Sequence, residues 1–209
     1  MRLALLALAC TAAAPGAGLV EAFGLKWRVP ILEDWKVERQ DGVPVLELLV
    51  PRPSLQPRRP SQYALAETPD YLTLDLELEV RKEPASTRNR RTSVMIVYAW
   101  RDENHFNYAH LSVDSAAQQP VHNGIFHVYG GERVRISPTE GPPTLVDEGW
   151  HKVRLHYDGG KGMVEVRVNG KTSPSMKAVD LSLGAGRFGI GSFFDMGSFR
   201  NVHVSGVTR

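Results

Sequence analysis

The residues whose types and spacing come closest to a catalytic arrangement are three carboxylates that alternate with leucines. Asp75, Glu77 and Glu79 occur in the run T-L-D-L-E-L-E-V. Side chains two residues apart on a β-strand share a face and lie about 7 Å apart. Retaining glycosidases use two carboxyl groups about 5–5.5 Å apart as nucleophile and acid/base. The same alternation is typical of the solvent face of an amphipathic strand, so the row supplies only weak catalytic candidates.

A second group combines aromatic rings with imidazoles on two neighbouring predicted strands. The strands cover residues 105–114 and 124–129, and the group consists of Tyr108, His110, His127 and Tyr129. If Phe126 and Val128 face the core and the strands pair, the four side chains converge on the outer face. Aromatic rings stack on sugar rings, and phenol and imidazole groups bond to hydroxyls. The pattern predicts a carbohydrate-binding face, with His110 and His127 as weak general-base candidates.

Metal and cofactor signals are sparse. No His-Glu-x-x-His motif is present, and a chain that loses Cys10 has no thiolate ligand. A carboxylate together with backbone carbonyl groups can bind calcium, which makes Asp34 and Asp195 weak calcium candidates. We therefore expect no required cofactor, with a structural calcium ion as an option.

Five arginines fall in two predicted loops: Arg58, Arg59, Arg88, Arg90 and Arg91. Such residues are usually solvated, but a cluster would attract an acidic polysaccharide, with binding that weakens as salt is added. The formal net charge of the 209 residues is only +2, which gives no reason to expect nucleic acid as a partner.

The N-terminus has the pattern of an export signal. Arg2 precedes an apolar stretch at residues 3–9, and small residues follow up to Ala22. We expect a signal peptide over residues 1–22 and a secreted or periplasmic chain. The apolar stretch is too short to span a bilayer. The alternative is a lipoprotein modified at Cys10.

The elements that must position these side chains are short strands. Val153, Leu155 and Tyr157 alternate with polar residues, as do residues 164–168, and Asn169-Gly170 supplies a tight turn between strands. Strands are also predicted at 35–38, 43–50, 71–80, 94–100, 133–136, 186–194 and 198–204, in addition to the two named above. No helical period is convincing. The pattern predicts an all-β fold, a two-sheet antiparallel jelly-roll sandwich, as one domain over residues 23–209.

Several of these runs resemble a known superfamily. They are V94-M-I-V-Y-A-W-R-D-E-N-H-F-N-Y-A-H-L, G149-W-H-K-V-R-L, V166-R-V-N-G-K, G186-R-F-G-I-G and F199-R-N-V-H-V. Their order resembles concanavalin A-like, laminin-G-like domains, and in particular bacterial secreted domains of the 3-keto-disaccharide hydrolase type, over nearly all of residues 23–206. The resemblance implies a jelly roll that binds sugars on or beside its concave face.

The chain departs from the hydrolase-type pattern at two places. Thr92-Ser93-Val94 replaces an N-S-G-like run, and Tyr108-Ala109-His110 lacks the acidic or amide residue expected after the tyrosine. The leading hypothesis is therefore a secreted carbohydrate-binding or adhesion module without catalysis and without a membrane span. The alternative is a glycoside-acting enzyme, most plausibly a 3-keto-glycoside hydrolase or lyase. A third hypothesis is a domain that only packs within a larger assembly.

Overall fold

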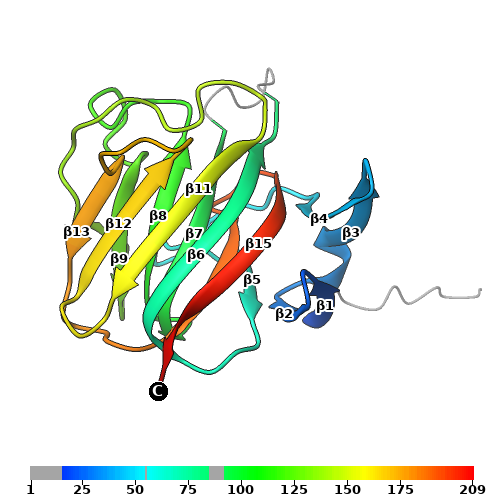
Figure 1. Cartoon of the computed structure of the whole chain (residues 1–209), viewed down its shortest axis with the longest axis horizontal. Coiled ribbons are helices and arrows are strands. Elements are labelled where there is room, and N and C mark those ends of the chain that lie inside the picture. Colours follow the sequence, from blue (N-terminus) through cyan, green and yellow to red (C-terminus); the bar gives the residue numbers. More distant parts are fainter. Residues whose placement is uncertain (1–15, 55, 85–91) are drawn as a thin grey trace, which may run out of the picture.

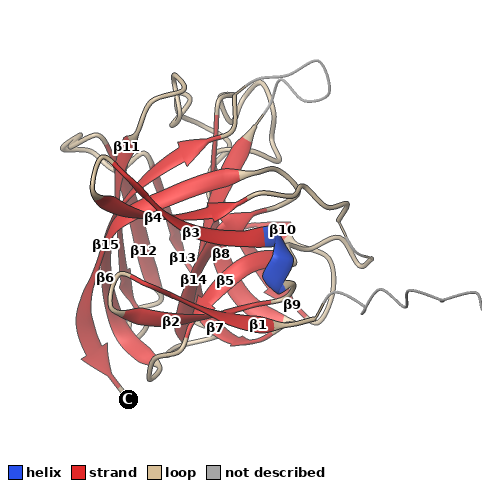
Figure 2. Cartoon of the chain, turned by 90° about the vertical axis from the view of Figure 1, so that its right-hand side faces the viewer, coloured by secondary structure: helices blue, strands red, loops and turns tan. Residues whose placement is uncertain are grey.

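The computed structural model describes residues 16–54, 56–84 and 92–209, which form two stacked antiparallel sheets (Figures 1 and 2). The eight-stranded sheet has the order β1 (Gly18–Ala22), β2 (Leu25–Val29), β5 (Gln62–Ala66), β14 (Arg187–Ser192), β7 (Ser93–Asp102), β8 (His105–Ser112), β9 (Gly124–Tyr129) and β10 (Val134–Arg135). The seven-stranded sheet has the order β13 (Met176–Val179), β12 (Met163–Val168), β11 (His151–Asp158), β6 (Tyr71–Lys82), β15 (Gly197–Thr208), β4 (Val43–Leu48) and β3 (Trp35–Gln40). The predicted all-β, two-sheet sandwich is confirmed.

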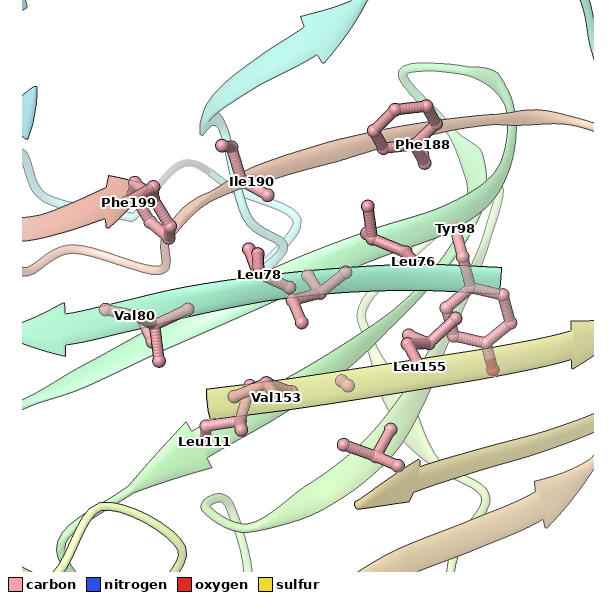
Figure 3. Packing of buried hydrophobic residues seen from close by; sticks show 14 of the residues in the cluster. Leu76, Leu78, Val80, Tyr98, Leu111, Val153, Leu155, Phe188, Ile190 and Phe199 are labelled. Carbon is pink, nitrogen blue, oxygen red and sulfur yellow. The ribbon is translucent and has the colours of Figure 1, made fainter. Parts of the chain in front are cut away.

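Period-two alternation gives β6, the central strand of its sheet, one buried face. Leu74, Leu76, Leu78 and Val80 are almost fully buried between the sheets, and the residues between them face outward. β6 pairs with β11 on one side and β15 on the other. Figure 3 shows its leucines packed with Phe188 and Ile190 of the opposite sheet. Burial of this continuous apolar layer is the main force that holds the sheets together.

The predicted hairpin turns are also present. Asn169 and Gly170 join β12 to the following segment with φ values of 53° and 70°, and Asp41 and Gly42 join β3 to β4 with φ values of 52° and 80°. Both central residues of a type I′ turn need positive φ, which Asn, Asp and Gly adopt most readily.

A second hydrophobic cluster covers the other face of the eight-stranded sheet, the face turned away from the seven-stranded sheet. It contains Tyr63, Leu65, Met95, Val97, Trp100, Phe106, Tyr108, Phe126, Val128 and Phe193. Nine of these ten come from β5, β7, β8 and β9, and Phe193 comes from the loop after β14. We call this set the outer cluster. The eight-stranded sheet is therefore apolar on both faces.

Four strands lie outside the sequence prediction: β1, β2, β5 and β13. β1 falls inside the predicted signal peptide, yet all five of its residues pair with β2, and Trp27 Nε1 donates to the Ala22 carbonyl at 3.1 Å. Cleavage after Ala22 stays a prediction, and it would remove this edge strand. Residues 1–15, with Cys10, and residues 85–91, with Arg88, Arg90 and Arg91, lie outside the described residues.

Candidate functional site

The acidic row lies on the outer face of the seven-stranded sheet, where each carboxylate has a cationic neighbour. Asp75 accepts from Arg154 Nη2 at 2.8 Å, and Glu79 accepts from Arg200 Nε at 2.7 Å. Glu77 lies 3.7 Å from Arg154 Nε. The sequence predicted that the three share a face, and the register confirms it.

Ion pairing sets the charge of this row. Burial alone would raise the pKa of Asp75, but bonds from Arg154 and His156 outweigh it and hold that pKa below its usual value. The pKa of Glu79 is lowered in the same way, mainly by Arg200 against the effect of burial. A glycosidase acid needs a raised pKa. The row thus has the character of a solvated, charge-paired sheet face.

The predicted aromatic and histidine face does not assemble. Tyr108 is paired with Phe126, and His127 with Asn107, in the β8–β9 register. Opposite residues of an antiparallel pair face the same side, so Tyr108 and His110 lie with Phe126 on the outer side, whereas His127 and Tyr129 face the opposite side. The assignment of Phe126 and Val128 to the core between the sheets was wrong, because they belong to the outer cluster.

Tyr108 and His110 are buried beneath loops. The exposed fractions are 0% for Tyr108 and 2% for His110. The Tyr108 hydroxyl accepts from Arg133 Nη1 at 2.9 Å, and His110 Nδ1 donates to the Val121 carbonyl at 2.9 Å. Burial, helped by the charges of His122 and Arg133, holds the pKa of His110 well below its usual value. His110 is therefore a neutral, enclosed imidazole.

His127 and Tyr129 lie where the edges of the two sheets approach each other. His127 Nδ1 lies 2.8 Å from Asn107 Oδ1 and 3.0 Å from Asp180 Oδ2, just after β13. The Tyr129 ring stacks on His127 at 5.4 Å and meets the edge of His105 at 4.7 Å. Tyr129 is 59% exposed. These contacts make a small surface cluster, separate from Tyr108 and His110.

A serine, a histidine and an aspartate meet at the loop after β8: Ser112, His122 and Asp114. Ser112 Oγ and Asp114 Oδ2 both lie 2.9 Å from the same ring nitrogen, Nδ1 of His122. A catalytic triad uses the two ring nitrogens separately, one for the nucleophile and one for the carboxylate. Ser112 N–H also donates to Asn123 Oδ1 and Thr144 Oγ1. The contacts therefore describe a network that fastens this loop to β8.

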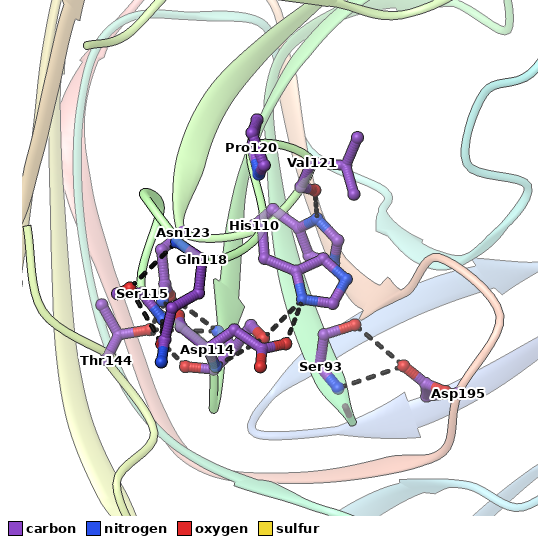
Figure 4. Close-up of polar contacts among 12 residues, drawn as sticks. Ser93, His110, Asp114, Ser115, Gln118, Pro120, Val121, Asn123, Thr144 and Asp195 are labelled. Atoms are coloured by element: carbon purple, nitrogen blue, oxygen red, sulfur yellow. Dashed lines mark hydrogen bonds and ion pairs between the residues drawn. The ribbon is translucent and has the colours of Figure 1, made fainter. Parts of the chain in front are cut away.

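The two calcium candidates already bind protein donors. Asp34 receives a two-pronged contact from Arg52, with Nε and Nη2 at 2.5 and 2.6 Å. Asp195 Oδ2 accepts from the Ser93 hydroxyl at 2.9 Å and from its N–H at 3.1 Å, as Figure 4 shows. Within residues 16–54, 56–84 and 92–209, no group of three or more His, Cys, Asp or Glu side chains is placed to hold a metal. Calcium at either carboxylate stays a prediction.

A cleft of about 350 Å³ opens on the outer side of the eight-stranded sheet. Its apolar lining includes Trp100, Tyr63 and Leu65, and its polar lining includes Arg28, Arg59, Asp102 and Glu103. An apolar surface with a few converging polar groups and a volume of roughly 300–1,000 Å³ is typical of a small-molecule site. A larger depression of about 650 Å³ beside the β1–β2 turn lacks this combination of Trp, Tyr and unlike charges.

A β-bulge directs Trp100 into this cleft. The β7–β8 register shifts after Tyr98, the β7–β14 register shifts between Gly189 and Arg187, and Ala99 has a φ of 49°. Tyr98 and Ala99 both belong to the core between the sheets, whereas Trp100 belongs to the outer cluster. Strict alternation would have placed Trp100 inside. Bulges re-aim side chains in this way beside functional sites.

Hydrogen bonding orients the two aromatic residues of the cleft. Trp100 Nε1 donates to the Tyr63 hydroxyl at 3.0 Å. Burial raises the pKa of Tyr63 to about 12, so the hydroxyl stays protonated and keeps its own hydrogen for another acceptor. Arg28 lies 5.7 Å from the Trp100 ring centroid and is paired with Glu67 at 3.1 Å.

The sequence analysis did not predict most of the cleft residues, although the sequence around Trp100 contains a pattern that could have indicated them. The sequence continues directly from Trp100 through Arg101, Asp102 and Glu103, an aromatic residue followed by charges at the end of a buried strand. Of the cleft residues, only Arg59 was singled out, as part of the arginine cluster.

Comparison with known proteins places the fold. No protein-family model and no curated protein matches the sequence. The carbohydrate-binding module CBM66 from Bacillus subtilis superposes with a TM-score of 0.56 at 12% identity, covering 82% of this chain and 95% of that chain. A protein from Parabacteroides distasonis, provisionally named a glycosyl hydrolase, superposes with a TM-score of 0.52 at 13% identity, covering 87% and 88%.

At these identities the likeness concerns the fold alone. The described residues contain no helix that is long and apolar enough to cross a membrane. The architecture follows from two observations. The chain forms two antiparallel sheets around one core, and it superposes on both solved structures over most of its length and of theirs. The chain therefore has a concanavalin A-like jelly-roll sandwich fold.

Proposed function

We propose that this chain is a secreted carbohydrate-binding module that holds a sugar in the Trp100 cleft. The observation that carries the proposal is the bulge at Ala99, which directs a tryptophan out of the core and into a cleft lined by hydrogen-bonding side chains. The occurrence of this fold in CBM66, which is named a carbohydrate-binding module, supports it.

The chemistry of the cleft suits a sugar ring. Tyr63 and Trp100 are each 8% exposed and form the apolar base of the cleft, against which C–H groups of a sugar pack. The Tyr63 hydroxyl can donate, and Glu103 can accept from sugar hydroxyls. Arg59 adds a cationic donor to the lining. Binding through many hydroxyl contacts requires this mixture of donors and acceptors.

Isothermal titration calorimetry tests the proposal. We would titrate exported wild-type protein with neutral and acidic oligosaccharides and with one 3-keto-disaccharide. We expect saturating heats for at least one ligand. Binding should be lost in Glu103→Gln and weakened in Trp100→Phe. Tyr129→Ala is the matched control, since it removes an exposed aromatic residue outside the cleft. Unchanged binding by the two cleft variants would refute the location.

The same titration examines the enzymatic alternative. A heat flow that persists in proportion to protein concentration would indicate turnover of a 3-keto-glycoside. The intact mass of the exported protein tests the secretion proposal at the same time, because it gives the position of leader cleavage or the mass of a lipid on Cys10. A chain that stays inside the cell with its leader intact would contradict secretion.

A further inference from the structure

Beside the cleft, arginine side chains cover the outer cluster. The guanidinium carbon of Arg133 lies 4.2 Å from the ring centroid of Phe193 and 4.9 Å from that of Phe126. Arg58 lies over Phe193 at 5.6 Å. The Arg133 backbone N–H donates to the Arg58 carbonyl at 3.1 Å, which ties the two loops together. Planar guanidinium groups stack well on aromatic faces.

The rings beneath these arginines are closed to a ligand. Tyr108, Phe126 and Phe193 are at most 2% exposed, so a sugar cannot stack on them. The surface above them presents guanidinium groups. Arg133 uses one Nη1 donor on the Tyr108 hydroxyl at 2.9 Å, and four of its five N–H donors remain for other partners.

Unlike their neighbours, these arginines form no ion pair with any residue that the structure describes. Arg28 and Arg187, which flank Trp100, lie 3.1 and 3.7 Å from Glu67. Arg58, Arg59 and Arg133, in contrast, have no carboxylate within 4 Å among the described residues. An unpaired cation on a shaped surface attracts an anionic partner.

The arginines adjoin the cleft. Arg59 belongs to the cleft lining and follows Arg58 in the chain. The rings of Tyr63 and Phe106 lie 5.6 Å apart, and those of Phe106 and Tyr108 lie 6.3 Å apart. One aromatic layer therefore runs from the cleft to Tyr108, whose hydroxyl accepts from Arg133. The cleft's carboxylates are Asp102, the last residue of β7, and Glu103, in the turn that follows.

We infer that Arg58, Arg59 and Arg133 form a subsite for the carboxylate or sulfate group of an acidic polysaccharide, beside a sugar unit held in the Trp100 cleft. The inference rests on the proposed function and names its ligand class. Guanidinium groups bind carboxylate and sulfate oxygens through paired, charge-assisted hydrogen bonds. The carboxylates at Asp102 and Glu103 repel the anion, which directs it toward the arginines.

Matched ligands and variants test the inference. The probes are trigalacturonate with its methyl ester, and a κ-carrageenan tetrasaccharide with its desulfated product, so that carboxylate and sulfate are separated. The main variant is Arg58→Gln, because Arg58 lies over Phe193 outside the cleft lining. Arg133→Lys keeps the charge but not the planar fork. Arg39→Gln, an exposed arginine of β3 in the other sheet, is the control.

We expect at least one acidic ligand to bind about tenfold more tightly than its neutral counterpart at low salt. Arg58→Gln should lose most of this preference and of its salt dependence while binding the neutral counterpart as wild type does, and Arg133→Lys should lose part of the preference. Equal wild-type affinity for charged and neutral ligands, or a preference that survives in full in Arg58→Gln, would overturn the inference and leave sugar binding intact. No binding to any probe would overturn both.

Discussion

Gly186 is the position at which one added methyl group should disturb the cleft most. It lies opposite the bulge at Ala99, and a Cβ atom there would lie 2.5 Å from the Ala99 carbonyl carbon and 2.7 Å from the Trp100 nitrogen. Ordinary contacts are about 3.4–4 Å, so the backbone must move by roughly 1 Å. Gly186 cannot retreat freely, because it exchanges hydrogen bonds of 2.9 and 3.1 Å with Tyr71.

Gly186→Ala should therefore lower both stability and affinity. Overpacking of this kind costs about 1–3 kcal/mol, which for a domain of this size corresponds to a Tm decrease of roughly 2–12 °C. A shift of Trp100 by about 1 Å should weaken sugar binding about tenfold, because a tight pocket loses several contacts at once.

Differential scanning calorimetry and titration calorimetry on the same samples check this prediction. Gly131→Ala is the matched control, because no atom lies within 4 Å of its Cβ position and its φ is not in the left-handed region. If Gly186→Ala matched wild type in both Tm and affinity, the bulge would not be what positions Trp100.

Three further predictions follow from buried groups. Tyr108→Ala removes a buried ring and should lower the free energy of unfolding by about 3–5 kcal/mol, whereas Tyr129→Ala removes an exposed ring and should lower it by at most about 0.5 kcal/mol. Equal losses in urea denaturation would contradict the placement of the two tyrosines. Because the pKa of His110 is depressed, the unfolded chain takes up a proton near pH 6.5 that the native state does not. Wild type should thus lose up to about 1.4 kcal/mol per pH unit below that point, and His110→Gln should lose less, in denaturation curves from pH 7 to 5. Since Asp34 and Asp195 already accept protein donors, EDTA should leave the Tm unchanged, and a decrease would identify structural calcium.

The fold was predictable because its signals are local. In β6, alternation alone assigned Leu76 and Leu78 to the core, and Asn169-Gly170 marked a tight turn. Both depend only on residues a few positions apart. The strand bounds at β9 were predicted without error.

The site was not predictable, because two of its causes are not local. In β9, Ile125, Phe126 and Val128 are all apolar, and only the loops that bury the outer cluster decide which of them faces the other sheet. In β7, the bulge at Ala99 has no Gly or Asn to announce it. It depends on close approach by Gly186, 87 positions later in the sequence.

The central claim is that a sugar binds in the Trp100 cleft of the eight-stranded sheet. An NMR titration of uniformly ¹⁵N-labelled protein with the tightest ligand of the panel tests it most directly. The account predicts chemical-shift changes at the Trp100 indole N–H and at the amides of Arg59, Tyr63 and Glu103, with Val166 of the other sheet unchanged. Changes centred on the outer face of the seven-stranded sheet, or around Tyr129 alone, would contradict it.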